Sequence, residues 1–348
     1  MNSLVLAPFS DGGLAVLRDI GAVAYEPWTQ TRRLFDPEEL GERLVAEHVG
    51  ALIVEADFLL EELFEGAPPL RFAAVCRASL NQVDLDAATE HGVVVVHTPG
   101  RNAQAVAELV LALMLALARR VPAAGAYAAS GEWEDPTEAY TRFHGRELTG
   151  ATLGLVGYGA IGRRVATLAH GIGMRVLAYD PYLAPNAPGL RSVALVDLET
   201  LLREADFVSI HAPDSASTAG LIDAAALRLM RPGAYLVNVS SPSVVDIAAL
   251  AAAIEGGALA GAALDVHEAH PIPPNAPMLA LARRMPERVL LTPHVGGATA
   301  ETVERHSAMV IEDLRRFLAG RRPKRLANPG VWSRRQRGIE ARFPLSRE

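Results

Sequence analysis

A turn of three spaced glycines between two apolar segments is the feature that most restricts how this chain folds. The motif GYGAIG spans residues 157–162 and directly follows the apolar segment Thr152–Val156. A helical stretch comes next, and then a second apolar segment, Met174–Tyr179, which leads into Asp180. Strand, glycine turn, helix and strand in this order predict a βαβ unit of a parallel sheet.

Each glycine of this turn has its own physical reason. Gly157 permits a tight turn, Gly159 lets the backbone approach a pyrophosphate, and Gly162 allows the helix to pack closely on the strand. Asp180 stands where an acid can accept a hydrogen bond from a ribose 2′-hydroxyl and would repel a 2′-phosphate. No arginine follows at once, so the pattern favours NAD over NADP. Glycine is common in turns and the motif alone would be weak, but here both strands, the helix and the acid are present. The cofactor-binding residues expected at this turn are Gly157, Gly159, Ala160, Ile161, Gly162 and Asp180.

Short apolar segments and helical stretches alternate through the rest of the chain. Such alternation predicts parallel sheets that helices cover on both faces. The second series runs to about Pro293, and a helix is expected from about Thr299 to Ala319. The fold class is therefore α/β, with two Rossmann-like, doubly wound sheets. In the first hundred residues the expected strands are Leu4–Ala7, Ala22–Tyr25, Ala51–Val54, Phe72–Val75 and Val93–His97, and the expected helices are Pro37–His48 and Asp57–Phe64.

One long helix is expected after Asn102, which would serve as its N-cap. Its central part, Ala105–Ala118, is apolar nearly all round apart from Glu108, and it is too short to span a bilayer. Such a helix should be buried, either within the chain or against a second subunit. The polar stretch 131–147 that follows is expected to be irregular.

Composition limits the possible partners. The chain has 348 residues, 50% of them hydrophobic, and a net charge of -7. This charge and the pI of about 5.8 argue against a nucleic-acid or anionic-membrane partner. The single cysteine, Cys76, excludes an intramolecular disulfide and suits a reducing compartment. The apolar run Leu4–Phe9 is too short for a signal peptide, so a cytoplasmic protein is expected.

The sequence resembles the D-isomer-specific 2-hydroxyacid dehydrogenases, a family that includes D-3-phosphoglycerate, D-lactate and formate dehydrogenases. The resemblance rests on blocks such as VDLDAATEHGVVVVHTPGRNAQAVAE, ELTGATLGLVGYGAIGRRVA, GAALDVHEAHPIP and LLTPHVGGAT, in this order. It implies a discontinuous substrate domain, residues 1–101 and 298–330, around an NAD-binding domain, residues 102–297. The end of the chain, residues 331–348, is basic and lacks periodicity, so a tail is expected there, either a flexible end or an arm on a partner. It also implies a homodimer built largely on the long helix after Asn102.

The resemblance also implies three catalytic positions, of which one holds the usual residue. His294, in LTPHVGG, would exchange a proton with the substrate oxygen. The family's arginine, which binds the substrate carboxylate and carbonyl, falls three residues after Asn238, where this chain has Ser241. The family's glutamate, which hydrogen-bonds the histidine, falls five residues after Asp265, where this chain has His270.

These departures should weaken recognition of a substrate carboxylate. Serine offers one hydroxyl and no charge in place of a planar guanidinium, a loss of roughly 1.5–3 kcal/mol. The turn at Arg77, Ala78 and Ser79 also lacks the glycines whose amides hold this carboxylate in the family. Simple 2-keto acids should therefore be reduced poorly, unless Arg77 supplies the missing charge. An ordinary solvated arginine at this position is an equally open interpretation, and Glu268 could stand in for the glutamate.

The remaining polar residues at predicted strand ends are weighed against simpler interpretations. His211 looks catalytic, but the resemblance puts it beside the cofactor with Pro213, Asn238 and Asp265. A metal site at His267, His270 and His294 with Asp265 has loose spacing, so no metal is expected. Cys76 is expected to be a buried small residue rather than a nucleophile.

Two functions of different class follow. The leading hypothesis is an NAD-dependent oxidoreductase that acts on a small-molecule 2-hydroxy or 2-keto acid, or a related carbonyl compound, with an altered substrate site. The alternative is an NAD(H)-binding regulatory or scaffold protein with little or no turnover. A change in NADH absorbance that depends on substrate would separate the two.

Overall fold

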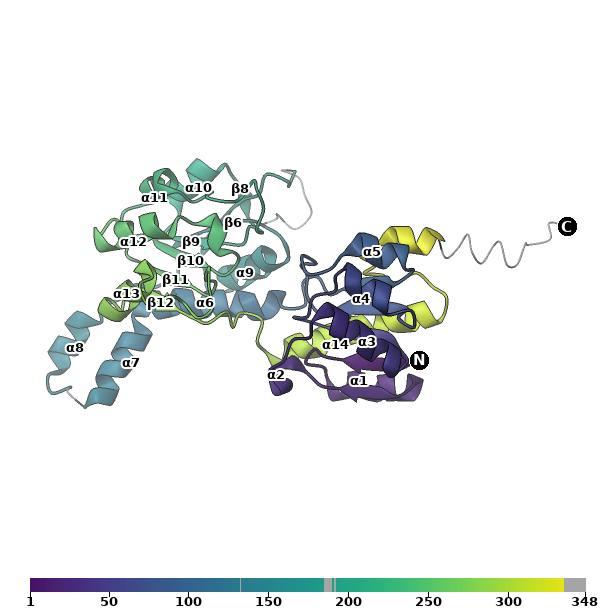
Figure 1. Ribbon diagram of the computed structural model, residues 1–348. Coiled ribbons are helices and arrows are strands. Elements are labelled where there is room, and N and C mark those ends of the chain that lie inside the picture. The colour runs from purple at the N-terminus through teal and green to yellow at the C-terminus, as the bar shows by residue number, and fades with distance from the viewer. Residues whose placement is uncertain (132, 185–189, 191, 335–348) are drawn as a thin grey trace. The chain divides into compact units, whose positions relative to one another are not determined.

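The computed structural model describes residues 1–131, 133–184, 190 and 192–334. The chain divides into two compact units. Unit 1 comprises residues 1–101 and the chain from Thr299 onward, and unit 2 comprises residues 102–298. Both units are parallel sheets with helices (Figure 1), so the α/β class predicted from the alternation is confirmed.

Unit 1 contains a five-stranded parallel sheet in the order β2-β1-β3-β4-β5. Its central strands are apolar along their whole length, because helices cover both faces of the sheet. The elements are β1 (Asn2–Val5), α1 (Asp11–Ile20), β2 (Val23–Tyr25), α2 (Trp28–Thr31), α3 (Pro37–Ala46), β3 (Val49–Val54), α4 (Glu61–Gly66), β4 (Phe72–Val75), α5 (Leu85–Glu90), β5 (Val94–His97) and α14 (Ala300–Leu318).

Unit 2 contains a seven-stranded parallel sheet in the order β12-β11-β10-β9-β6-β7-β8. Within this sheet the chain starts at the interior strand β6, adds β7 and β8 on one side, and returns to add β9 to β12 on the other. Its elements are α6 (Ala103–Arg119), α7 (Val121–Ser130), α8 (Pro136–Arg142), β6 (Thr152–Val156), α9 (Ala160–Gly171), β7 (Arg175–Tyr179), β8 (Ala194–Leu195), α10 (Leu198–Glu204), β9 (Phe207–Ile210), α11 (Ala224–Leu229), β10 (Tyr235–Asn238), the short 3₁₀ helix η1 (Pro242–Val244), α12 (Ile247–Glu255), β11 (Gly261–Leu264), α13 (Pro277–Arg284) and β12 (Val289–Leu291).

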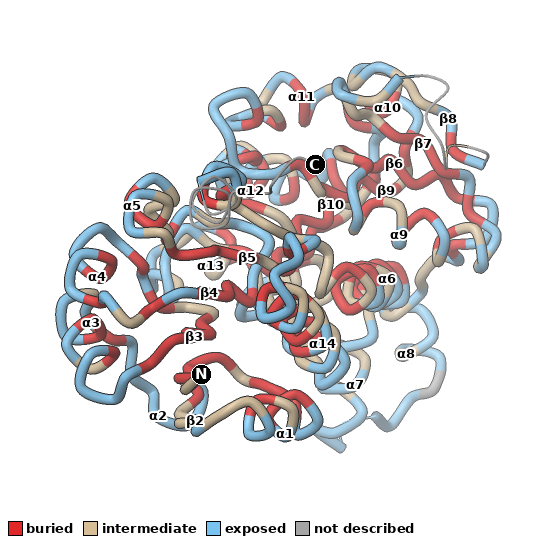
Figure 2. Tube along the Cα trace, turned by 90° about the vertical axis from the view of Figure 1, so that its right-hand side faces the viewer, coloured by how far each residue is buried: buried red, intermediate tan, exposed pale blue. Residues whose placement is uncertain are grey.

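The cores lie on the two faces of each sheet. In Figure 2 the inner strands are buried almost throughout, whereas the edge strand β2 is only partly buried and most helices have buried residues on one side. On one face of the unit 2 sheet, α6 packs beside α9, and Val110, Leu113 and Met114 of α6 are buried there. The opposite side of α6 is partly open, since Leu115 is 41% exposed. The helix is therefore buried on one side within the chain.

Helices α7 and α8 extend from the rest of unit 2 as a pair (Figure 1). The expectation of an irregular stretch at 131–147 is wrong, because α8 lies within it. Its first turn is stabilised by Asp135, whose carboxylate accepts a hydrogen bond from the Thr137 amide at 2.8 Å. Among the described residues no single helix is long and apolar enough to cross a membrane. The pair α6 and α7, bent by 60° relative to each other, has sufficient length and apolar composition only when the two helices are taken together.

Three other expectations need correction. Helix α4 begins at Glu61 and not at Asp57, because the buried Asp57 carboxylate accepts a hydrogen bond from the Phe35 amide and holds an irregular segment. Asn102 occupies the N-cap position of α6, but its side chain makes no capping hydrogen bond. The tail expected from residue 331 starts inside the core, since Val331 is fully buried, and residues 335–348 lie outside the described part of the chain.

Candidate functional site

The strand ends of unit 2 are aligned, and this alignment brings the predicted site residues to one edge of the sheet. Ile210 of β9 pairs with Val156 of β6 on one side and with Asn238 of β10 on the other. The register continues from Asn238 through Leu264 to Leu291. The residues that follow these strands therefore emerge along a common carboxyl edge, which is where open α/β sheets bind ligands.

The glycine turn at this edge has the geometry that its sequence predicts. Gly157 has φ +96°, and a Cβ there would lie 2.8 Å from both the His211 carbonyl carbon and the Ala212 amide. A Cβ on Gly162 would lie 2.5 Å from the Gly157 oxygen. Gly159, in contrast, faces open space, since no described residue beyond its immediate chain neighbours has an atom within 4 Å of the position of its Cβ. Two glycines thus close the turn, and the third leaves room for a ligand against the backbone.

The start of α9 lies beside this open space. Gly159 is the N-cap of this 12-residue helix and has no side chain to satisfy the amides of the first turn, to which Ala160 and Ile161 belong. Such amides and the helix dipole favour an anion. Asp180, after β7, accepts hydrogen bonds from the Tyr158 amide at 2.9 Å and the Tyr182 amide at 3.0 Å. Each carboxylate oxygen has a second lone pair, which is available to a hydroxyl donor.

His211 lies next to this turn and is held neutral. Its Nε2 lies 2.9 Å from the Ser209 hydroxyl, while its Nδ1 is buried and has no partner among the described residues. Burial lowers the pKa of His211 to about 3, because a charged imidazole would lose its hydration. This residue is therefore unsuited to proton exchange near pH 7. Pro213, two residues on, is exposed.

The segment after β10 is a closed network of short polar side chains. Asn238 donates to the Ser241 carbonyl at 2.8 Å and accepts from the Ser240 amide at 3.1 Å. The hydroxyl of Ser241, a residue only 6% exposed, lies 2.9 Å from the Ser243 hydroxyl and accepts from the Ser243 amide at 3.3 Å. Ser243 in turn donates to Asp214 at 2.6 Å. The Ser241 hydroxyl is thus engaged within the chain, and the network ends in a carboxylate.

Asp265 organises the loop that presents His294. The buried carboxylate accepts hydrogen bonds from the Thr292 hydroxyl at 2.6 Å, the Val295 amide at 2.9 Å and the Gly296 amide at 2.8 Å. His294 lies between these anchors with φ 57°, in the left-handed region that few residues other than glycine adopt. An exposed histidine held in this way is typical of a functional position.

Two more histidines lie beside His294. The His270 ring centroid is 5.9 Å from that of His294, with an angle of 30° between the ring planes, and 6.2 Å from that of His267. His267 is oriented by a contact of 2.9 Å between its Nε2 and the Thr292 carbonyl. Glu268 is exposed. No group of three or more His, Cys, Asp or Glu in the described part of the chain has the arrangement that a metal ion needs.

Unit 1 presents the third set of predicted residues. Arg77, Ala78 and Ser79 follow β4 and are all exposed. No hydrogen bond or ion pair of the Arg77 guanidinium is found among the described residues. Cys76, directly before them, is fully buried, and burial raises the pKa of its thiol far above the usual range. The cysteine is therefore a packing residue, and Arg77 is an available cation.

Sequence reasoning missed two groups of polar residues. Asp214 and Ser243 belong to none of the predicted sites, although both are polar residues that follow predicted strands. In unit 1, Glu55 and Arg101 form a nearly buried ion pair that no motif indicates. Only the position of Glu55, directly after an apolar strand, could have indicated it.

Several known proteins are similar to this chain along most of its length. The family model described as "D-isomer specific 2-hydroxyacid dehydrogenase, NAD binding domain" matches residues 111–296. A glyoxylate reductase of Thermococcus litoralis is 39% identical over 286 residues, which cover 81% of this chain and 85% of the reductase. A D-3-phosphoglycerate dehydrogenase of Mycobacterium tuberculosis is 41% identical over 278 residues, 78% of this chain, and this chain spans only 51% of that enzyme's length. The crystal structure of the TT0316 protein from Thermus thermophilus superposes with a TM-score of 0.80 at 37% identity, covering 94% of this chain and all of that one.

Proposed function

Because this chain belongs to the D-isomer specific 2-hydroxyacid dehydrogenase family, we propose that it interconverts a small 2-keto acid and the corresponding 2-hydroxy acid. The family assignment makes it an NAD-dependent dehydrogenase that acts on a CH–OH group. The choice of substrate and the roles of the individual residues are the proposal. The similarity to a glyoxylate reductase supports a short-chain substrate.

NAD fits the residues at the carboxyl edge of unit 2. The turn at Gly157 is closed, the space beside Gly159 is open, and the first amides of α9 have no side-chain cap. These groups would hold the pyrophosphate, and the Asp180 carboxylate would accept the ribose hydroxyls. His211, Pro213, Asn238 and Asp265 follow strands at the same edge and would border the nicotinamide end. When bound, NAD supplies the acceptor of a hydride, and NADH supplies its donor.

His294 is the proposed proton donor and acceptor. Three hydrogen bonds from the flanking residues to Asp265 restrain the loop, so the backbone that carries the imidazole is positioned before substrate binds. It would give a proton to the carbonyl oxygen during reduction and take one from the hydroxyl during oxidation. His270, whose ring lies beside it, has no negative charge with which to stabilise the protonated form.

Arg77 is the proposed partner of the substrate carboxylate. The Ser241 hydroxyl is already bonded within its own network, and that network ends at the anionic Asp214. Arg77 is exposed and has no partner among the described residues, and the amides of Ala78 and Ser79 follow it. Of the two interpretations that the sequence leaves open, we therefore favour a binding arginine over a merely solvated one. A single exposed cation that does not polarise the carbonyl supports only modest catalysis.

One observation carries the proposal: the intact cofactor turn and the constrained His294 emerge at the same edge of one sheet. The test is a turnover screen with NADH across glyoxylate, pyruvate, neutral ketones and aldehydes. We expect reduction of glyoxylate and pyruvate, with kcat/KM below about 10⁴ M⁻¹s⁻¹ because Ser241 stands where the family has an arginine.

Arg77→Met should raise KM for these acids about tenfold and leave kcat within a few-fold. Saturable NADH binding without consumption of any compound would instead indicate an NADH-binding regulatory protein.

We also propose a role for each unit, a dimeric assembly and a cellular location. Unit 1 would be the substrate domain and unit 2 the NAD-binding domain, which agrees with the residues that the family model matches. A homodimer built on α6 and the helices after it is supported by Leu115 and Tyr140, which are 41% and 77% exposed. The acidic net charge and single cysteine support a cytoplasmic protein whose partners are small molecules rather than nucleic acid or membranes.

A further inference from the structure

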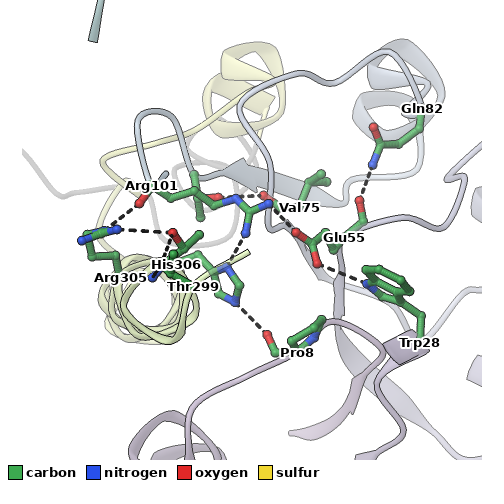
Figure 3. Close-up of polar contacts among 11 residues, drawn as sticks. Pro8, Trp28, Glu55, Val75, Gln82, Arg101, Thr299, Arg305 and His306 are labelled. Atoms are coloured by element: carbon green, nitrogen blue, oxygen red, sulfur yellow. Dashed lines mark hydrogen bonds and ion pairs between the residues drawn. The ribbon is translucent and has the colours of Figure 1, made fainter. Parts of the chain in front are cut away.

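Unit 1 has a strand order with a switch point, and polar side chains of the unit meet there. In the order β2-β1-β3-β4-β5 the chain leaves β1 toward one side and later β3 toward the other, so the switch point, where such sheets bind ligands, lies between the carboxyl ends of β1 and β3. Pro8 follows β1 and Glu55 follows β3. Figure 3 shows the guanidinium of Arg101 joined to Glu55 and to His306, which in turn is joined to the Pro8 carbonyl.

Arg101 is held there by several partners. Its guanidinium forms an ion pair with Glu55, and the two side chains are only 12% and 16% exposed. Another guanidinium nitrogen lies 2.8 Å from Nδ1 of His306. The Nε2 of His306 donates to the Pro8 carbonyl at 2.7 Å, so the neutral imidazole accepts from Arg101. The second Glu55 oxygen accepts from the Trp28 indole at 3.1 Å, which leaves the carboxylate bound on both sides.

Both ends of the turn that presents Arg77 are connected by hydrogen bonds to the backbone of the two residues that form this ion pair. At the first end, the Thr98 amide donates to the Arg77 carbonyl at 3.0 Å, and the Arg101 amide donates to the Thr98 carbonyl at 3.4 Å. At the second end, the Gln82 side chain donates to the Glu55 carbonyl at 2.8 Å. The turn itself is exposed from Arg77 to Ser79. It is also restrained by a contact of 3.0 Å between the His97 Nδ1 and the Ala78 carbonyl, so the bonds to Glu55 and Arg101 act together with this contact.

We propose that Arg101 is a positioning residue for substrate recognition: through its pair with Glu55 it holds the Arg77 turn in the conformation that binds the substrate carboxylate. This inference rests on the proposed role of Arg77. Arg101 itself does not contact the substrate, because its guanidinium is used by Glu55 and His306. The ion pair fixes the position of the turn, and the position of the turn determines KM for the substrate through Arg77.

The test compares Arg101→Met with Arg43→Met. Arg43 is a matched control, since it is also a partly buried arginine of unit 1, paired with Glu26 and Glu47 away from the Arg77 turn. Arg101→Met should raise KM for glyoxylate by roughly 10- to 100-fold, because small misplacements of binding groups have effects of this size. It should leave kcat and the NADH dissociation constant within a few-fold. Arg43→Met should change none of these values.

Two further measurements separate positioning from loss of folding. Hydrogen exchange of peptides covering residues 76–84 should accelerate in Arg101→Met and not in Arg43→Met, whatever the activity. In Arg101→Ala, millimolar ethylguanidine should restore KM by occupying the vacated space. If Arg101→Met fails to fold, Arg101→Lys and Glu55→Gln should show the same rise in KM to a smaller degree.

The outcomes distinguish this inference from the proposed function. Unchanged exchange at residues 76–84 in a folded Arg101 variant overturns the inference. A fall in kcat with unchanged KM also overturns it, because that result reflects fewer active molecules. An unchanged KM in Arg77→Met overturns the proposed role of Arg77, while faster exchange in Arg101→Met would still establish that the ion pair holds the turn.

Discussion

At the scale of single residues, the proposed cofactor-binding positions of unit 2 hold the residues expected of the family, whereas the proposed substrate-binding positions 241 and 270 do not. Asp180 and the three glycines satisfy the demands of a dinucleotide, each through backbone geometry that its residue type allows. After β10, by contrast, Ser241 and Ser243 bond to each other and to Asp214. Cofactor binding and substrate recognition therefore depend on separate residues and can be tested independently.

Replacing Asp180 tests the preference for NADH. The carboxylate should favour the 2′-hydroxyl and repel a 2′-phosphate, so Asp180→Ala should reduce the ratio of NADPH to NADH dissociation constants by about 10- to 100-fold. Fluorescence titration with the two cofactors measures this ratio. A wild type that binds NADPH as tightly as NADH would show that Asp180 does not select the cofactor.

Replacing His294 tests proton exchange. His294→Ala should lower kcat by about 10²–10⁴-fold, the usual contribution of a general acid or base, and leave NADH affinity within a few-fold. His267→Ala is the control, because His267 lies in the same cluster and is oriented toward the Thr292 carbonyl. If turnover survives in His294→Ala, His270 becomes the next candidate for the residue that exchanges a proton with the substrate.

At the scale of elements, local patterns predict the strands and glycine turn, and long-range contacts decide the rest. The segment from Thr152 to Asp180 was predictable because each requirement of the turn is met by a neighbour in sequence. Helix α8 was missed, although Asp135 before it is a typical N-cap. The Arg101–His306 contact joins residues 205 positions apart, and no local pattern encodes such a pair.

The site was predictable in part for the same reason. The residue types at 241 and 270 could be read directly from the sequence, but what their side chains contact could not. The Ser241 hydroxyl contacts the Ser243 hydroxyl, and the His270 ring lies beside the His294 ring. The second of these contacts depends on how separate loops pack in the folded chain. Resemblance locates such positions, and only the structure identifies their neighbours.

The exposed apolar residues of α6, α7 and α8 lead to a prediction about assembly. Val121 and Tyr140 are 55% and 77% exposed, and burying them against a second copy would be favourable. Light scattering at micromolar concentration should give twice the mass of one chain, and Val121→Glu with Tyr140→Lys should shift it toward the monomer. Phe58→Lys, a change at a similarly exposed apolar residue of unit 1, should have no effect. A monomeric wild type would contradict the proposal.

At the scale of the whole molecule, buried neutral histidines should make folding sensitive to acid. Burial lowers the pKa of His306 to about 4, while an unfolded chain has a histidine pKa near 6.5. The unfolded state therefore binds more protons between these values, and stability is complete above about pH 6.5 and declines as pH falls toward 4. The loss attributable to His306 is roughly 3 kcal/mol.

Denaturant unfolding of the wild type and His306→Gln between pH 4 and 7 measures this loss. Glutamine can accept a hydrogen bond from Arg101 and donate one to the Pro8 carbonyl without titrating. The stability of the His306→Gln protein should therefore fall less steeply with acid than that of the wild type. His211, whose pKa is also lowered by burial, stays in both proteins and contributes equally to both curves. Parallel curves would show that His306 does not control acid stability.

The serine network after β10 also bears on how easily this position could revert over evolutionary time. An arginine at position 241 would remove the hydroxyl that bonds Ser243, and Pro242 would restrict the backbone from which the new side chain projects. The arginine would also arrive in a site only 6% exposed, next to a carboxylate at Asp214 that already has a partner. Restoring an arginine here would therefore remove the serine network in the same step, so this one substitution would be costly unless Pro242 or Ser243 changed with it.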